Sequence, residues 1–237
     1  MKKRMLLISN STNAGEEYLA HCINNIREFL GEQIRKVLFI PYAGVSISFD
    51  EYTSKVAEHF YKTGYETDPV HKYNDPVQAV RNAEAIAVGG GNTFNLVHLL
   101  HKNKLIDIIR EKVNNGIPYI GWSAGSNVVC PTLKTTNDMP IVEPESFNTL
   151  DLVPFQINPH YLDAHPEGHA GETREMRIEE FIIANPDVSV MGLREGTMLR
   201  IEGDKMRLIG SRKMRLFKQG MQPHEYDSDA ELDFLLK

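Results

Sequence analysis

The first half of the chain alternates short apolar runs with segments in which apolar residues recur at helical spacing. The apolar runs predict buried strands at 5–9, 36–41, 85–88 and 118–121, with a weaker strand near Tyr65. The helical spacing predicts helices over 16–30, from 50, from 75, over 93–101 and over 105–114. Alternation of this kind is typical of an α/β fold with a mostly parallel sheet and helices on both faces.

The second half changes character, because strands there are separated by shorter connections. Strands are predicted at 152–157 and 188–193, with a helix over 173–183 between them. The segments 198–201 and 206–209 flank a polar Gly-containing turn and predict a hairpin, with a further strand at 215–218 and a short helix near the end. We find no internal repeat or linker, so a single α/β domain over 1–237 is expected.

Composition narrows the class of protein. A net charge of −6 argues against nucleic acid or an anionic membrane as a partner, and no run approaches the length of a membrane span. The apolar run after the first basic residues stops at Ser9, too short for a signal peptide. With only 2 cysteines, no disulfide framework is indicated. We expect a cytoplasmic protein.

One stretch combines a strand, a tight turn and the start of a helix over 124–130. Gly121-Trp122-Ser123-Ala124-Gly125 has the Gly-x-Ser-x-Gly form of a nucleophile elbow, which presents a serine hydroxyl above the edge of a sheet. The flanking glycines allow the sharp turn, and the Ala124 amide at the helix start would face an oxyanion. The alternative is an ordinary glycine-rich connection between a strand and a helix.

A serine nucleophile needs a base, which is usually histidine. Of 9 histidines, His160 follows a predicted strand and a proline, and it is the first candidate. His165 and His169 are the alternatives. The three together suggest a metal site only weakly, because neither a His-Glu-x-x-His pair nor a cysteine ligand accompanies them. We therefore expect no metal and no cofactor.

The base in turn needs a carboxylate to orient it. Asp138 follows the elbow helix, and Glu195 follows the predicted strand 188–193. Either acid could instead be a turn residue, since Asn137 and Gly196 beside them are common in turns. No motif chooses between the two, although the place of Glu195 at a predicted strand end, where a parallel sheet gathers its active residues, favours it.

A second glycine-rich turn, Gly89-Gly90-Gly91-Asn92, follows the predicted strand 85–88. It lacks the Lys-Ser/Thr ending of a phosphate-binding loop. We interpret the Gly91 amide as a second oxyanion donor and Asn92 as a candidate for substrate contact. A purely structural turn is the alternative.

Five blocks of the sequence together carry a resemblance to a known family. They are Gly-Gly-Gly-Asn-Thr-Phe (89–94), Gly-Trp-Ser-Ala-Gly (121–125), Thr-Thr-Asn-Asp-Met-Pro-Ile-Val (135–142), Gln-Ile-Asn-Pro-His (156–160) and Gly-Glu-Thr-Arg-Glu (171–175). Over about residues 5–200 the chain resembles peptidase E, the α-aspartyl dipeptidase family. The resemblance implies a cytoplasmic serine peptidase that cleaves Asp-Xaa dipeptides, on a fold like that of class I glutamine amidotransferases. It implies Ser123 as nucleophile and His160 as base, and it leaves Asp138 and Glu195 open.

A substrate aspartate needs a fixed cation, and arginine suits a carboxylate because its planar fork binds in two places. Arg174, at a predicted helix start, is the first candidate, and His169 is the second. The alternative for Arg174 is a solvated surface residue. For the whole protein, the competing functions are an esterase of the α/β-hydrolase type and a non-catalytic binding module on the same fold. The pattern leaves the oligomeric state open.

Overall fold

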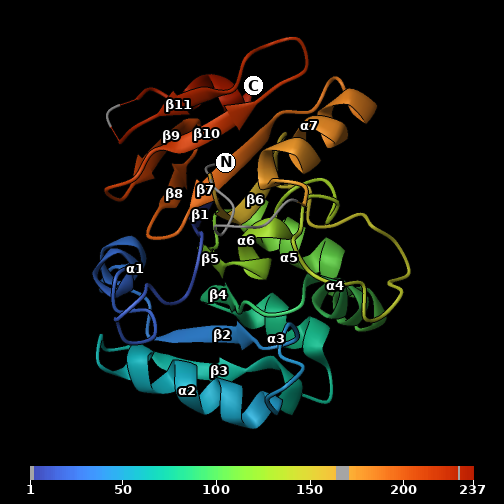
Figure 1. Cartoon of the computed structure of the whole chain (residues 1–237). Coiled ribbons are helices and arrows are strands. Elements are labelled where there is room, and N and C mark those ends of the chain that lie inside the picture. The colour runs from blue at the N-terminus through green and yellow to red at the C-terminus, as the bar shows by residue number, and fades with distance from the viewer. Residues whose placement is uncertain (1–2, 164–170, 229) are drawn as a thin grey trace.

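The computed structural model describes residues 3–163, 171–228 and 230–237. Its larger sheet has seven strands in the order β3-β2-β4-β5-β1-β8-β9 (Figure 1). Their bounds, in that order, are Glu66–Pro69, Lys36–Ile40, Ala85–Val88, Tyr119–Trp122, Arg4–Ile8, Met198–Glu202 and Lys205–Ile209. The first five strands run parallel, and the hairpin β8–β9 joins them antiparallel through β1. The expected mostly parallel α/β sheet is therefore confirmed.

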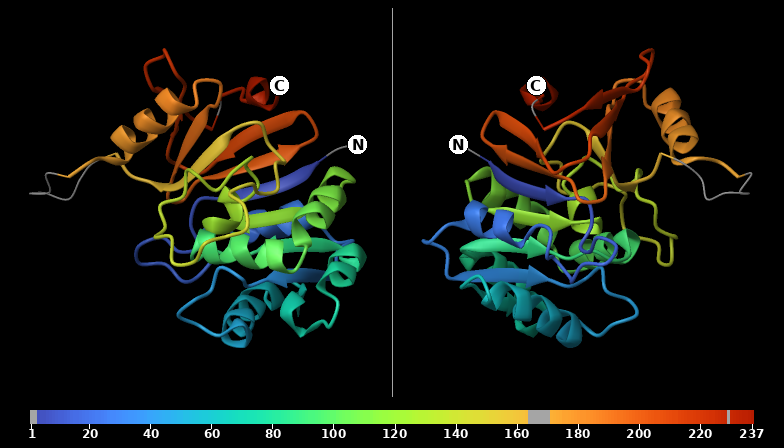
Figure 2. Two further views of the ribbon diagram at one scale, coloured as in Figure 1. Left: turned by 90° about the vertical axis from the view of Figure 1, so that its right-hand side faces the viewer. Right: turned by 60° about the vertical axis from the view of Figure 1, so that its left-hand side comes forward.

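Helices cover both faces of this sheet (Figures 1 and 2). On one face, α1 (Ile23–Leu30) and α2 (Phe49–Tyr61) pack on alternate strand residues such as Leu6 and Phe39. On the other face, the strand residues between these, such as Leu7 and Leu38, belong to a second core. That core is covered by α3 (Pro76–Asn82), α4 (Thr93–Lys102), α5 (Leu105–Asn114) and α6 (Ala124–Asn127). The period of two along each strand thus divides the apolar side chains between two cores.

A second sheet of four strands has the order β11-β10-β7-β6. Its strands are His224–Tyr226, Met214–Phe217, Val190–Arg194 and Gln156–Tyr161. Residues from its strands, including Ile157 and Leu193, share one core with Leu7 of the larger sheet. Helix α7 (Arg174–Ala184) packs on the far side of the smaller sheet through Ile178 and Ile182. The two sheets therefore form one domain.

Local sequence explains where several elements begin. Helix α2 starts at a capping box in which Ser48 and Glu51 satisfy each other's backbone amides. Asp75 caps α3 with Pro76 at its first position, and Thr173 caps α7. Short 3₁₀ turns, Val70–Lys72 and Asp233–Leu236, complete the elements.

Three boundaries differ from the prediction. Helix α1 begins at Ile23 rather than 16, because the preceding segment is a series of turns in which Leu19 has a φ of 58°. Helix α6 has only 4 residues, and β6 is displaced toward the C-terminus, so that His160 lies within the strand instead of after it. In the described part of the chain, none of the helices combines the length and hydropathy that crossing a membrane requires.

Candidate active site

The turn around Ser123 has the geometry that the motif predicts. Ser123 has φ 53° and ψ −113°, a conformation that non-glycine residues rarely adopt. Its amide donates to the Ile8 carbonyl at 3.0 Å, which anchors the turn to the neighbouring strand β1. The serine is therefore held at the carboxyl end of β5, between that strand and α6.

Both glycines of the motif are required by close backbone contacts. A Cβ on Gly121 would lie 2.2 Å from the Gly125 carbonyl oxygen, and one on Gly125 would lie 2.1 Å from the Val88 carbonyl oxygen. Neither contact can be relieved by rotating a side chain, because the clashing atoms belong to the backbone. The Gly-x-Ser-x-Gly spacing is thus a packing requirement of this turn.

Ser123, His160 and Glu195 are linked by hydrogen bonds. His160 Nε2 lies 3.0 Å from Ser123 Oγ, and His160 Nδ1 lies 2.8 Å from Glu195 Oε1. The His160 and Glu195 side chains are 37% and 38% exposed, so the pair borders solvent. Of the two acids left open by the sequence, Glu195 is the one placed on His160.

His160 is held in an unusual backbone position. It lies at an irregularity in the pairing of β6 with β7 and has a φ of 53°. Its amide donates to Ser9 Oγ at 3.0 Å, and Ser9 Oγ donates to the Leu193 carbonyl at 2.8 Å. Ser9 stands at the end of β1, so one buried hydroxyl joins the larger sheet to both strands that hold the histidine and the glutamate.

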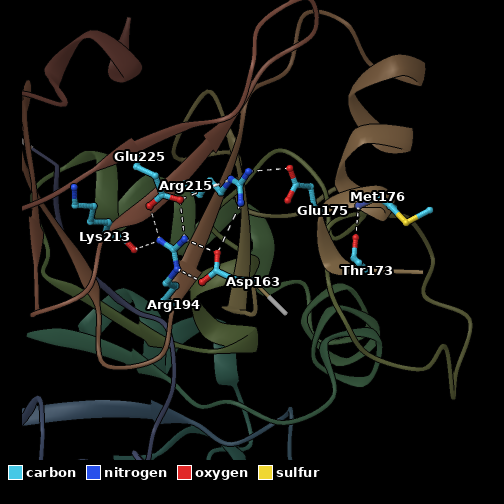
Figure 3. Close-up of polar contacts among 8 residues, drawn as sticks. All are labelled: Asp163, Thr173, Glu175, Met176, Arg194, Lys213, Arg215 and Glu225. Carbon is cyan, nitrogen blue, oxygen red and sulfur yellow. Dashed lines mark hydrogen bonds and ion pairs between the residues drawn. The ribbon is translucent and has the colours of Figure 1, made fainter. Parts of the chain in front are cut away.

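Glu195 is positioned by contacts on both sides of it. On one side, the Gly196 amide donates to Asn10 Oδ1 at 2.8 Å. On the other, the Arg194 guanidinium lies between the carboxylates of Asp163 and Glu225, which it meets at 2.5 and 2.7 Å (Figure 3). These charge-assisted bonds raise the pKa of Arg194. The turn after β7 is therefore fixed from both ends.

Asp138 has a different position. Its Oδ2 accepts hydrogen bonds from the Thr93 amide at 2.7 Å and from the hydroxyls of Thr93 and Thr136 at 2.6 and 2.9 Å. Thr93 is the first residue of α4, where a carboxylate satisfies a free amide and complements the helix dipole. Asp138 thus ties the loop after α6 to the start of α4 and has no hydrogen bond to His160.

The glycine run after β4 lies against the serine. A Cβ on Gly90 would come within 2.9 Å of Ser123 Cβ, and one on Gly91 would lie 2.2 Å from the Ala43 carbonyl oxygen. The amides of Gly91 and Ala124 are both free of hydrogen bonds within the described part of the chain.

Ser123 and His160 open into a cleft of about 530 Å³. Its walls come from residues that follow β1, β2, β4 and β5, including Ser11, Ala43 and Gly91, and from the start of α2. In a parallel sheet the carboxyl ends of the strands gather at one edge, which is where ligands bind. The position of the cleft follows this rule.

The expected substrate-contacting residues are placed as follows. Asn92 lines the cleft, but its side chain caps α4 by accepting from the Asn95 amide and donates to the Met139 carbonyl. Arg174 donates to Asn137 Oδ1, and no carboxylate of the described residues pairs with it. Burial and nearby Arg177 lower the pKa of Arg174, against the opposing effect of Asp138. His165 and His169 lie outside the described residues.

Asn137 connects Arg174 to the strand that carries His160. Its Nδ2 donates to the Pro159 carbonyl at 2.7 Å, and its Oδ1 also accepts from Asn158 Nδ2 at 2.6 Å. Ser9, Asn10 and Asn137 were not singled out from the sequence as site residues. For Ser9 and Asn10 the sequence does indicate a place near the site, because both are polar residues directly after a buried strand, at the edge where ligands bind.

Comparisons of the sequence and the fold with known proteins all find peptidases. The sequence model of peptidase family S51 matches residues 5–209. A peptidase E of Nostoc sp. is 56% identical over 237 residues, which cover 100% of this chain and 98% of the relative. A peptidase E of Shewanella amazonensis is 45% identical over 236 residues, covering 100% of each. The crystal structure of a peptidase from an acI-B1 Actinobacterium superposes with a TM-score of 0.71 at 17% identity, over 97% of this chain and 96% of that one. This last likeness bears on the fold alone, and it confirms the expected class.

Proposed function

The chain belongs to peptidase family S51 and is a serine peptidase, and we propose that it hydrolyses Asp-Xaa dipeptides through an acyl-enzyme at Ser123. The observation that supports this most directly is the hydrogen-bonded series from Ser123 through His160 to Glu195. Such a series turns a weak hydroxyl nucleophile into an active one.

In the proposed reaction, Ser123 Oγ attacks the peptide carbonyl carbon while His160 Nε2 takes the hydroxyl proton. Glu195 accepts a hydrogen bond from His160 Nδ1 and stabilises the imidazolium that forms. The amides of Gly91 and Ala124 bind the oxyanion. Collapse of the intermediate breaks the C–N bond, and His160 gives its proton to the leaving amine. Water then attacks the acyl-enzyme, with His160 again acting as base, and releases aspartate.

Arg174 is the proposed partner of the substrate aspartate side chain. Its guanidinium is half-buried, has no carboxylate partner in the described residues, and is held by Asn137 beside the strand of His160. A positive charge that burial disfavours gains from a bound anion. Arg174 is the first residue of α7, and the field of this helix N-terminus favours a bound carboxylate by roughly 0.3–1 kcal/mol.

The alternative functions fit less well. An α/β-hydrolase orders its triad as serine, acid and histidine along the chain, whereas the order here is Ser123, His160, Glu195. A binding module has no need of a serine held in a strained turn against a histidine. Relatives that match the whole chain are named peptidase E. The expected cytoplasmic location stays a proposal, supported by the free, buried thiols of Cys22 and Cys130.

The test compares hydrolysis of Asp-Leu and Asn-Leu by the unmodified enzyme and by Arg174→Met. The unmodified enzyme should prefer Asp-Leu strongly, and Arg174→Met should lose that preference through the Asp substrate alone. Arg177→Met is the matched control, because Arg177 lies on the same helix and pairs with Glu172 at 3.6 Å. If the ratio of Asp-Leu to Asn-Leu hydrolysis does not change in Arg174→Met, Arg174 is a solvated surface residue and does not bind the substrate.

A further inference from the structure

The cleft beside Ser123 has a one-sided charge. Among the described residues that line it there is no aspartate or glutamate, and Lys55 is the one lysine or arginine. Most of the remaining wall consists of small or hydroxyl-bearing residues such as Ser11, Gly44 and Ser46. A group that binds in this cleft therefore meets one permanent positive charge and no competing carboxylate.

Lys55 lies on α2, and its ammonium has an aromatic contact in place of an ion pair. Its Nζ lies 4.1 Å from the centre of the Tyr18 ring, and no carboxylate in the described part of the chain pairs with it. Lys62, at the end of the same helix, shows the usual alternative: its Nζ lies 3.2 Å from Glu58 Oε1. A cation over a ring keeps its charge available on the side facing away from the ring.

The Tyr18 ring that Lys55 contacts is connected by hydrogen bonds to the turn beside Ser123. The Tyr18 hydroxyl lies 3.4 Å from the Tyr52 hydroxyl, which donates to the Gly90 carbonyl at 2.9 Å. Gly90 is the residue whose Cβ would touch Ser123. One series of contacts therefore runs from the Tyr18 ring, on which the Lys55 ammonium lies, to the turn that touches the reacting serine.

A dipeptide brings a charge to this place. Its C-terminal carboxylate stands one residue beyond the scissile carbonyl, a separation of about 4 Å. In the proposed function Arg174, which is not among the described residues lining the cleft, binds the aspartate side chain, so the C-terminal carboxylate needs a different cation. We propose that Lys55 binds the free C-terminal carboxylate of the leaving residue and so restricts the enzyme to dipeptides.

This inference deepens the proposed function and rests on the assignment of Ser123 as nucleophile. It explains chain-length selection by chemistry: a third residue converts the carboxylate into a neutral amide, which leaves the ammonium without an anion. A lysine suits this task because it acts as a compact point charge toward a carboxylate whose orientation varies with the leaving residue.

The experiment measures kcat/KM for Asp-Leu and for Asp-Leu amide with the unmodified enzyme, Lys55→Met and Lys62→Met. The unmodified enzyme and Lys62→Met should favour the free acid by at least about tenfold, a typical effect of one charge-assisted contact. Lys55→Met should lower kcat/KM for the acid to about the value for the amide, and leave the amide unchanged. Lys55→Arg should keep part of the preference.

Two results would overturn the inference: an acid/amide ratio near one in the unmodified enzyme, or an equal loss on both substrates in Lys55→Met. The second would indicate that Lys55 supports the fold of the cleft. The acid/amide ratio can be measured with any dipeptide that the enzyme cleaves, and it is separate from the Asp/Asn ratio that tests Arg174. A failure of Asp selectivity therefore leaves the test of Lys55 unaffected.

Discussion

Replacing Glu195 by glutamine is expected to lower kcat for a dipeptide by about 10²–10³ while leaving the stability of the fold nearly unchanged. Glu195 Oε1 accepts from His160 Nδ1 at 2.8 Å, which leaves Nε2 free to take the proton of Ser123. A glutamine amide can donate to Nδ1 instead, and this selects the tautomer with its proton on Nε2, facing the serine. The histidine then cannot act as a base.

The size of the effect follows from the exposure of the pair. Loss of the carboxylate costs about 10⁴ in kcat where it is buried. Here the two side chains are 37% and 38% exposed, so water stabilises part of the charge on the imidazolium. We therefore expect the smaller loss, which corresponds to about 3–4 kcal/mol of transition-state stabilisation.

Asp138→Ala should have the opposite profile. It removes three hydrogen bonds to the Asp138 carboxylate, including the one from the first amide of α4. The loss of a helix cap and its hydrogen bonds costs about 2 kcal/mol, which lowers Tm by about 4–8 °C in a domain of this size. Turnover at 25 °C should remain within tenfold of the unmodified enzyme.

The assay pairs steady-state kinetics with thermal unfolding for both variants. Because Glu195 has no part in capping a helix and Asp138 has no hydrogen bond to His160, the two measurements should separate cleanly. An Asp138→Ala protein that folds normally and is inactive, beside an active Glu195→Gln protein, would show that the hydrogen bond at His160 Nδ1 is not the one that matters.

Two further expectations follow from the site. Ser123→Ala should lower kcat by about 10⁴–10⁶ with little effect on folding, and retention of more than a tenth of the activity would rule out the acyl-enzyme. Arg215→Met should weaken the Asp/Asn preference several-fold, because Arg215 binds Glu175, the residue after Arg174, at 2.8 Å and lies 3.8 Å from Asp163, which ties α7 to the segment after β6 (Figure 3). Lys205→Met is the control, because Lys205, on β9, pairs with Asp233 at 2.6 Å. An equal effect of both variants would show a general loss of surface charge.

The sequence was sufficient for the fold class because the period of two in the strands and of 3.6 in the helices is set by local chemistry. Each of the five parallel strands of the larger sheet has a predicted counterpart, but β3 is predicted only as a weak strand near Tyr65, because its residues Glu66–Pro69 are polar and contain a proline. A short edge strand of this kind has little apolar surface to bury, so no apolar run marks it. The first helix is predicted too long for a different reason. Apolar residues keep a helical spacing through the turns before Ile23, although Leu19 has a φ of 58°, which a helix cannot contain.

The site was predictable to the extent that a single turn encodes it. Gly121 and Gly125 cannot carry a Cβ, so the motif around Ser123 can be read directly from the sequence. The choice between Asp138 and Glu195 could not, because it depends on how two sheets pack. His160 and Glu195 are 35 residues apart in the chain and meet through the pairing of β6 with β7. Ser9, which holds His160 from 151 residues away, has no sequence signal beyond its place at a strand end.

The serine and its histidine belong to different sheets, and this determines how the site depends on the fold. Ser123 ends a strand of the larger sheet, whereas His160 lies in the smaller one. Their 3.0 Å contact therefore requires the sheets to keep a fixed relative position. The shared core provides the packing, and the hydrogen bond from Asn127 Nδ2 to the Ile157 carbonyl, 2.8 Å long, joins the helix after the serine to the strand of the histidine. Because a packed core resists small displacements, the distance between Ser123 Oγ and His160 Nε2 is set by the interior of the protein, whereas the walls of the cleft come mostly from the loops after the strands.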